Sequence, residues 1–121
     1  MTVVATIAVL VIALLHLYFL LLEMVFWTKP RGRKAFNLTP EFALASKSLA
    51  ANQGLYNGFL AAGLLWGVIE GVSTPMGMAL ETFFLLCVIV AGLFGAATAS
   101  RKILWIQGLP ALIALILVRL A

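Results

Sequence analysis

The residues that could do chemistry in this sequence are polar side chains set within long apolar segments. They are His16, Glu23, Asn52, Gln53, Tyr56, Asn57 and Gln107. An ionisable side chain within a membrane-spanning helix is costly, so it normally faces other helices or a wet cavity. We therefore take these seven residues as the candidate ligand-binding set. His16 and Glu23 are also the candidate catalytic residues, because they could give and take a proton.

The composition identifies the solvent that these side chains must tolerate. Hydrophobic residues make up 64% of the 121 positions, and charged residues make up 10%. A soluble domain has roughly one quarter charged residues, so the composition predicts an integral membrane protein. One crossing needs about 20 apolar residues, which leaves room for four crossings in a single domain. We expect an all-α, polytopic membrane four-helix bundle over residues 1–121.

The elements that position the polar set are four expected transmembrane helices. They cover about residues 3–27, 40–70, 78–99 and 103–120. Thr39-Pro40-Glu41 is typical of a helix start, since Thr caps free amides, Pro suits the first turn and Glu favours the positive dipole end. The segment from Thr28 to Lys34 is expected to be a basic loop. Pro110 is expected to bend the last helix.

The basic residues predict the orientation. Seven of the eight flank the first and third connections, and only Arg119 lies at the opposite end. The seven are Lys29, Arg31, Arg33, Lys34, Lys47, Arg101 and Lys102. Because cytoplasmic loops carry the excess of Lys and Arg, both termini should be non-cytoplasmic. Cations confined to short loops also argue against a nucleic-acid partner.

Helix geometry predicts how the polar residues gather. His16 and Glu23 are seven positions apart and fall within about 20° of each other on one face. Measured inward from the cytoplasmic ends, Glu23, Asn52, Gln53 and Gln107 should form a shallow layer, with His16 and Asn57 deeper. The alternative interpretation is that these side chains only hydrogen-bond the helices together. A row of Gly54, Gly58 and Ala62 suits close contact with another helix, in the same chain or in a homodimer.

Three residues are expected to carry no site. Glu70 and Glu81 flank the outer connection and should be solvated. Cys87 lies in an apolar stretch with no partner at metal-ligand spacing, so it should only pack. We expect no metal and no cofactor.

Two stretches resemble hallmark stretches of a known family. They are Leu22-Glu23-Met24-Val25-Phe26-Trp27-Thr28-Lys29-Pro30-Arg31-Gly32-Arg33 and Ala51-Asn52-Gln53-Gly54-Leu55-Tyr56-Asn57-Gly58-Phe59. The family is a bacterial integral-membrane family catalogued as domain of unknown function 1304, and the resemblance spans essentially the whole chain. It implies a multi-pass protein of the bacterial cytoplasmic (inner) membrane, but no activity, cofactor or substrate. A weaker likeness, to the DoxX-like and emopamil-binding groups, rests on helix count and residue types alone.

Three functions fit these observations. The first is binding or transport of a small polar or amphipathic ligand at the intramembrane polar site. The second is a membrane-embedded enzyme that does proton-transfer, isomerase-like chemistry on a lipid-soluble substrate. The third is a structural membrane assembly protein. The expected partners are membrane lipids and a second copy of the chain, bound through Gly54, Gly58 and Ala62.

Overall fold

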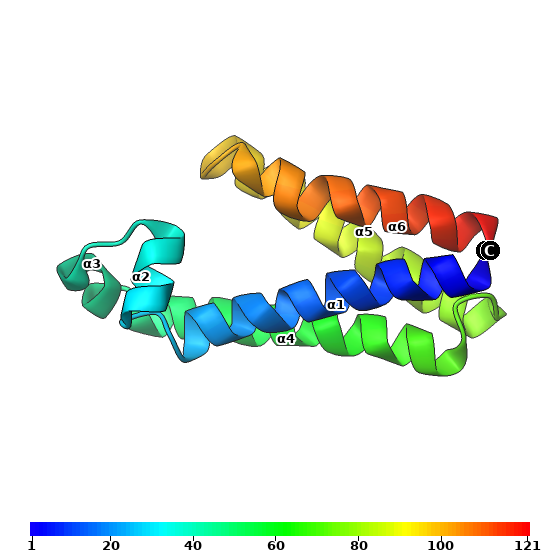
Figure 1. Ribbon diagram of the computed structural model, residues 1–121, viewed down its shortest axis with the longest axis horizontal. Helices are drawn as coiled ribbons and strands as arrows, with labels where there is room; N and C mark the ends of the chain where they lie inside the picture. Colours follow the sequence, from blue (N-terminus) through cyan, green and yellow to red (C-terminus); the bar gives the residue numbers. More distant parts are fainter. The chain divides into compact units, whose positions relative to one another are not determined.

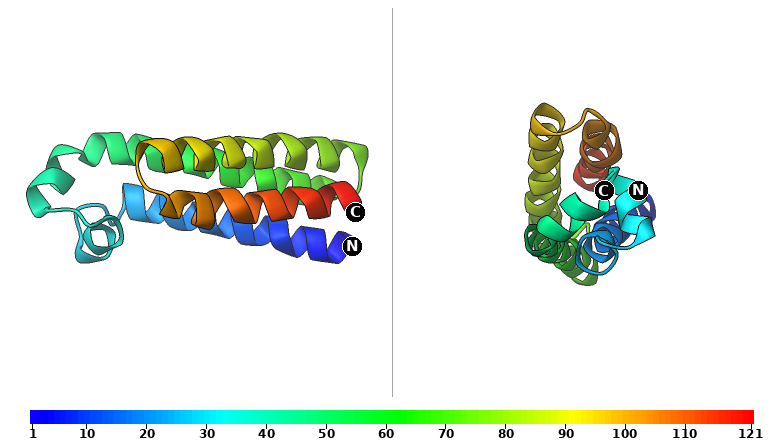
Figure 2. Two further views of the ribbon diagram at one scale, coloured as in Figure 1. Left: turned by 90° about the horizontal axis from the view of Figure 1, so that it is seen from above. Right: turned by 90° about the vertical axis from the view of Figure 1, so that its left-hand side faces the viewer.

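The computed structural model describes all residues from 1 to 121, and every regular element in it is a helix (Figures 1 and 2). This confirms the expected all-α class. The elements are α1 (Thr2–Met24), α2 (Pro30–Phe36), α3 (Pro40–Ala45), α4 (Lys47–Glu70), α5 (Pro75–Thr98), the π-helical turn η1 (Leu104–Gly108) and α6 (Leu109–Leu120).

The chain divides into two compact units. Unit 1 consists of Met1–Ala13 and Leu60–Ala121, and unit 2 consists of Leu14–Phe59. Unit 1 therefore holds the first half of α1, the end of α4, and all of α5, η1 and α6. Unit 2 holds the rest of α1, the short helices α2 and α3, and the start of α4.

Unit 1 encloses an apolar core. Its fully or nearly fully buried residues are Ala5, Val9, Ile12, Ala13, Leu64, Val72, Leu85, Val88, Ala111, Ala114 and Val118. The α4–α5 connection turns at Gly71, whose φ of 96° is a left-handed conformation that favours glycine. Helix α5 then begins at Pro75, and the Thr74 side chain accepts a hydrogen bond of 3.1 Å from the Gly77 amide.

Helices α5 and α6 run side by side (Figure 2) and meet closely at two glycines. A Cβ atom on Gly92 would lie 2.7 Å from both the Cα and the N atom of Gly108. The two backbones are therefore in direct contact. Gly108 ends the π-helical turn, and Pro110 lies in the first turn of α6. The backbone is thus distorted by a π turn just before Pro110, and the bend predicted for this proline stays a prediction.

Unit 2 is held by the contact of α1 with α4. A Cβ on Gly54 would lie 2.5 Å from Cγ of Met24, and one on Gly58 would lie 2.8 Å from Cδ1 of Leu20. Between these helices the chain forms α2 and α3. Trp27 anchors this connection, because its indole N–H donates to the Ser46 hydroxyl at 3.0 Å and its ring packs on Phe36 at 5.0 Å.

Several helix boundaries differ from those predicted. Pro30 starts the helix α2 within the segment expected to be a loop, because proline fits the first turn of a helix as well as it ends one. The expected helix 40–70 is interrupted at Ser46, while its predicted cap is confirmed by a 3.2 Å bond from the Phe42 amide to Thr39 Oγ1. The third helix begins at Pro75 rather than near residue 78.

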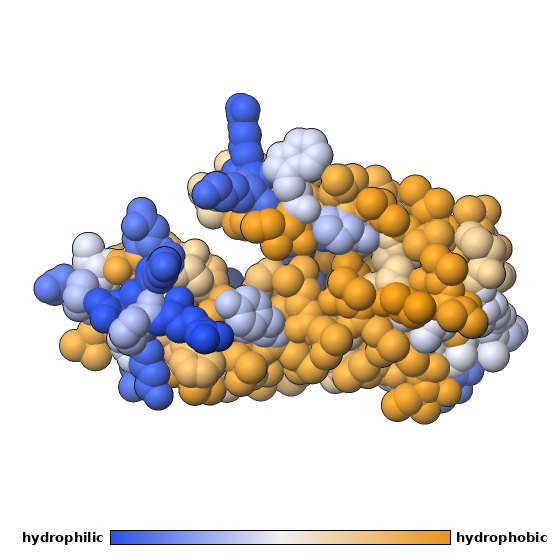
Figure 3. Space-filling view, viewed as in Figure 1, coloured by the Kyte–Doolittle hydropathy of each residue, from blue (hydrophilic) through white to orange (hydrophobic).

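Two helices are long and apolar enough to cross a membrane, namely α1 and α5. Only 28% of each apolar window is buried, so most of these side chains face outward, unlike those of a core helix in a soluble protein. In Figure 3 hydrophobic residues cover most of the long helices, while hydrophilic residues gather over α2 and α3 and over the α5–η1 turn. The apolar segment Leu104–Leu120 is shorter, and α4 does not meet the same test, so four crossings remain a prediction.

The Gly92–Gly108 contact leads to a testable expectation. Gly92→Leu should lower the stability of the purified protein in detergent by about 1–3 kcal/mol, because the new side chain meets backbone that cannot move aside. Thermal unfolding followed by circular dichroism measures the change. Ala97→Leu, on the exposed side of α5, is the matched control and should leave the midpoint nearly unchanged. Equal midpoints for the two variants would show that the contact does not hold α5 to η1.

Candidate functional site

Glu23 and Asn57 are joined directly in unit 2. The side-chain amide of Asn57, on α4, donates to Oε1 of Glu23, on α1, at 2.5 Å. Gly54, one turn earlier on α4, lets the helices approach, since a Cβ there would lie 3.1 Å from Cβ of Glu23. The two residues were predicted at different depths. Their hydrogen bond instead brings the two side chains to the same level. Glu23 is next to Met24, the last residue of α1, whereas Asn57 lies ten residues, roughly 15 Å, after the start of α4.

His16 is the one completely buried residue among the predicted polar candidates. Its exposed fraction is 0%, and its ring meets Phe19 edge-on at 5.4 Å. It lies two helical turns, about 10 Å, before Glu23 on α1. The shared face of His16 and Glu23 stays a prediction.

The remaining candidates of unit 2 lie on the exposed side of α4. Asn52 donates its side-chain amide to the Ser48 carbonyl of its own helix at 2.9 Å, and Gln53 is exposed. Tyr56 is 54% exposed, with its ring tilted against Phe59. These side chains are exposed, and the shallow layer predicted from the sequence stays a prediction. Gln107 belongs to η1 in unit 1, where it is half-buried.

The row of small residues is used inside the chain. Gly54 and Gly58 both pack on α1, against Glu23, Met24 and Leu20, while Ala62 is exposed. Of the two alternatives predicted for this row, contact within the same chain is therefore present at the glycines. A homodimer through Gly54, Gly58 and Ala62 stays a prediction.

Glu81 is the residue that the sequence interpretation missed. It was expected to be solvated, but its exposed fraction is 0%, and neither carboxyl oxygen has a hydrogen-bond partner. Glu81 is buried because it lies within α5, which starts at Pro75. The buried positions of this helix are Gly77, Glu81, Leu85, Val88 and Gly92. That spacing of three and four is the inner stripe of a helix. The periodicity of α5 could have placed Glu81 inside.

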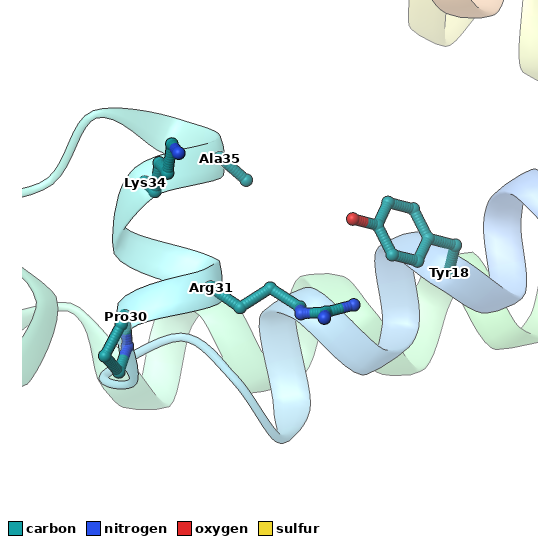
Figure 4. Close-up of a pocket in the computed structure, with 5 residues that line it drawn as sticks. All are labelled: Tyr18, Pro30, Arg31, Lys34 and Ala35. Atoms are coloured by element: carbon teal, nitrogen blue, oxygen red, sulfur yellow. The ribbon is translucent and has the colours of Figure 1, made fainter.

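A further group of residues lines an open crevice in unit 2. The crevice has a volume of about 550 Å³ and is lined by Tyr18, Pro30, Arg31, Lys34 and Ala35 (Figure 4). We call it the basic crevice. Arg31 extends from α2 toward α1, and the hydroxyl of Tyr18 projects from α1 toward α2. The crevice exists only when α2 is a helix, whereas the sequence pattern there indicates a loop, so it was not predicted.

The charged side chains that line the basic crevice are all positive. No acidic side chain lines it, and neither Arg31 nor Lys34 forms an ion pair. The guanidinium of Arg31 lies 5.9 Å from the ring centre of Phe26, at cation–π distance. Its polar lining therefore consists of a phenol, a guanidinium and an ammonium group, a set suited to anions.

The other cavity belongs to unit 1 and has a different character. Its volume is about 250 Å³, and it is lined by Ile89, Leu93, Leu104, Trp105, Gly108, Leu109 and Leu112. This lining offers no charged group. No three His, Cys, Asp or Glu side chains lie together in a way that could hold a metal ion.

Comparisons with known proteins agree with the resemblance noted in the sequence. The family model described as "Protein of unknown function (DUF1304)" matches residues 10–119. The "Uncharacterized protein YpaA" of Lactococcus lactis subsp. lactis (strain IL1403) is 30% identical over 118 residues, which cover 96% of this chain and 97% of that protein. No solved structure matches this chain. The chain thus belongs to the DUF1304 family, whose function is unknown.

Proposed function

We propose that this protein is an integral membrane protein that binds an anionic amphipathic molecule, with the anionic group in the basic crevice. The observation that carries the proposal is the pairing of Arg31 and Lys34 with Tyr18 in one crevice that contains no carboxylate. The ligand class is a phospholipid with an anionic headgroup. The proposal keeps the amphipathic ligand expected from the sequence and moves its site from the interior of the helices to the crevice.

The membrane setting rests on the two long apolar helices and their outward-facing side chains. We infer that α4 and the segment Leu104–Leu120 cross the membrane as well, since the end of α4 and the whole of this segment lie in unit 1 with parts of α1 and α5. The excess of Lys and Arg in α2 supports a cytoplasmic position for that helix, by the positive-inside rule. We infer that this membrane is the bacterial cytoplasmic (inner) membrane, as the sequence resemblance implies.

The crevice chemistry fits a phosphate-bearing headgroup. A guanidinium presents a planar fork of N–H donors that matches phosphate oxygens, and a Lys ammonium adds a second positive charge. Tyr18 lies six residues, about 9 Å, before the end of α1, and its hydroxyl adds a third donor.

An apolar surface adjoins the crevice on α1. Leu14, Tyr18 and Leu21 are 63%, 44% and 44% exposed, and their spacing of four and three puts them on one face of the helix. An acyl chain could lie along this face while its headgroup contacts Arg31. A free phosphate ion would make only the polar contacts, so the adjoining apolar face favours a lipid.

The cations of the basic crevice give the first test of this proposal. Arg31→Gln/Lys34→Gln should weaken binding of a water-soluble short-chain phosphatidylglycerol by at least about tenfold. Each lost hydrogen bond to a charged group is worth about 1.5–3 kcal/mol, and 1.4 kcal/mol is tenfold in affinity. Isothermal titration calorimetry of the purified protein in detergent measures this affinity.

Two controls separate the crevice from general surface charge. Arg101→Gln/Lys102→Gln removes the same charge from the exposed α5–η1 connection and should bind like the wild type. Short-chain phosphatidylcholine and inorganic phosphate should both bind weakly to the wild type. Equal loss in both double variants would reduce the effect to net charge, and tight binding of inorganic phosphate would identify a free anion as the ligand.

Tyr18→Phe tests whether the ligand reaches α1. Loss of one hydroxyl hydrogen bond of about 0.5–1.5 kcal/mol should weaken phosphatidylglycerol binding by about two- to tenfold. The same titration measures it. The control Tyr56→Phe removes an exposed hydroxyl of α4 that lies outside the crevice. An unchanged affinity in Tyr18→Phe would confine the ligand to α2.

We assign the Glu23–Asn57 pair a structural role that supports the crevice. The hydrogen bond connects α1 and α4 close to the point where α1 ends, one residue before Met24. Tyr18 is on the same stretch of α1, so its position depends on this contact. This assignment follows the alternative in which membrane polar residues fix helix packing.

Asn57→Leu should lower the thermal midpoint of the protein, since it leaves the half-buried Glu23 carboxyl without its donor. A lost partner of this kind costs about 1–3 kcal/mol. Asn52→Leu is the matched control, because Asn52 is exposed and bonds only within its own helix. If the two variants unfold at the same temperature, the pair does not hold α1 to α4.

A further inference from the structure

Glu81 is an isolated acid in the core of unit 1. Its exposed fraction is 0%, and neither Oε1 nor Oε2 has a hydrogen-bond partner. The residues that share its stripe on α5 are Gly77, Leu85, Val88 and Gly92, none of which carries a polar side chain. The lipid-binding proposal makes no use of this residue, which lies in the other unit.

The carboxyl group of Glu81 lies directly on the backbone of α4. A Cβ on Gly67 would overlap Oε1 of Glu81, so only glycine leaves room for the carboxyl at this position. Two neighbouring contacts continue the same interface, because a Cβ on Gly63 would overlap the ring of Phe84 and one on Gly77 would overlap the Gly71 carbonyl oxygen. The close approach of α4 and α5 therefore encloses Glu81.

No charge in unit 1 compensates a carboxylate at this position. The other ionisable groups of unit 1 form no hydrogen bond with Glu81, and their charged side chains are all exposed. They are the Met1 amine, Glu70, Cys87, Arg101, Lys102, Arg119 and the Ala121 carboxylate. The core around Glu81 consists of residues such as Leu64, Val72 and Leu85. An ionised carboxylate in such surroundings is strongly disfavoured relative to the neutral acid.

We propose that Glu81 is a proton-binding site, in which the carboxyl group is held as the neutral acid while α4 packs on α5 at Gly67. The ligand is a proton rather than a metal ion, because a metal ion needs several ligands and Glu81 belongs to no group of three His, Cys, Asp or Glu side chains that could supply them. Removal of the proton creates a charge that the core cannot hold. The charged form is then accommodated only when the α4–α5 contact opens to water.

Infrared spectroscopy of the full chain in lipid nanodiscs tests the proton directly. At neutral pH the wild type should show the C=O band of a protonated carboxylic acid, and Glu81→Gln should lose a component of it. Glu70→Gln removes an exposed acid of the same unit, and Glu23→Gln removes the half-buried acid of unit 2. Both should retain the component. A Glu81→Gln spectrum identical to that of the wild type would overturn the proposal.

Thermal unfolding as a function of pH tests the link to packing. Raising the pH should lower the midpoint of the wild type relative to Glu81→Gln, whose neutral amide cannot ionise. Glu70→Gln should follow the wild type at every pH. A constant difference between the wild type and Glu81→Gln would contradict the proposal even if the variant were less stable throughout. Neither readout involves a lipid titration, so failure of this proposal would be distinguishable from failure of the proposed lipid binding.

Discussion

The close approach of helix backbones at glycine is the constraint on which the rest of this structure depends. Lipid tails are as apolar as leucine, so helices in a membrane gain little by hiding hydrocarbon from their surroundings. They associate through tight packing, and glycine allows the tightest. In unit 2 this occurs at Gly54 and Gly58 against α1. In unit 1 it occurs at Gly67 against α5 and at Gly92 against Gly108.

These contacts also set where polar groups can exist. Gly54 brings α4 close enough to α1 for Asn57 to reach the Glu23 carboxyl. Gly67 leaves a space that the Glu81 carboxyl occupies. The two acids therefore have opposite surroundings, one with a donor supplied by the neighbouring helix and one with bare backbone. Glu23 has a donor because Asn57 lies near Gly54 on α4, whereas Glu81 lies against the Gly67 backbone and has none.

The sequence predicted the helical class and the start of the helix at Pro40, because apolar length and capping residues act locally. It did not predict α2, since a proline, a glycine and four cations are equally compatible with a loop until Trp27 packs on Phe36. The hydrogen bond of Trp27 to Ser46 also ties that connection to the start of α4. Such contacts depend on tertiary structure, which no local pattern contains.

The candidate site was predictable in part for the same reason. Helical periodicity correctly put Glu23 on an interior face, but the choice of Asn57 over Asn52 or Gln53 as its partner depends on how far α4 extends past the end of α1. Glu81 was misplaced because proximity to a connection was given more weight than its spacing with Leu85 and Val88. The basic crevice forms only because α2 folds as a helix beside α1. No pattern in the sequence links Tyr18 to Arg31 and Lys34, so the crevice could not be predicted.

The π turn at Leu104–Gly108 has a consequence for the faces of the last helical segment. A π turn holds one more residue than the α-helical turn that it replaces, and each added residue rotates what precedes it by about 100°. A helical wheel drawn through α6 and continued backward therefore assigns Gln107 and the residues before it to the wrong side. A relative that lacks one residue in this stretch would have a straight helix, and its counterpart of the Arg101-Lys102 segment would point in another direction.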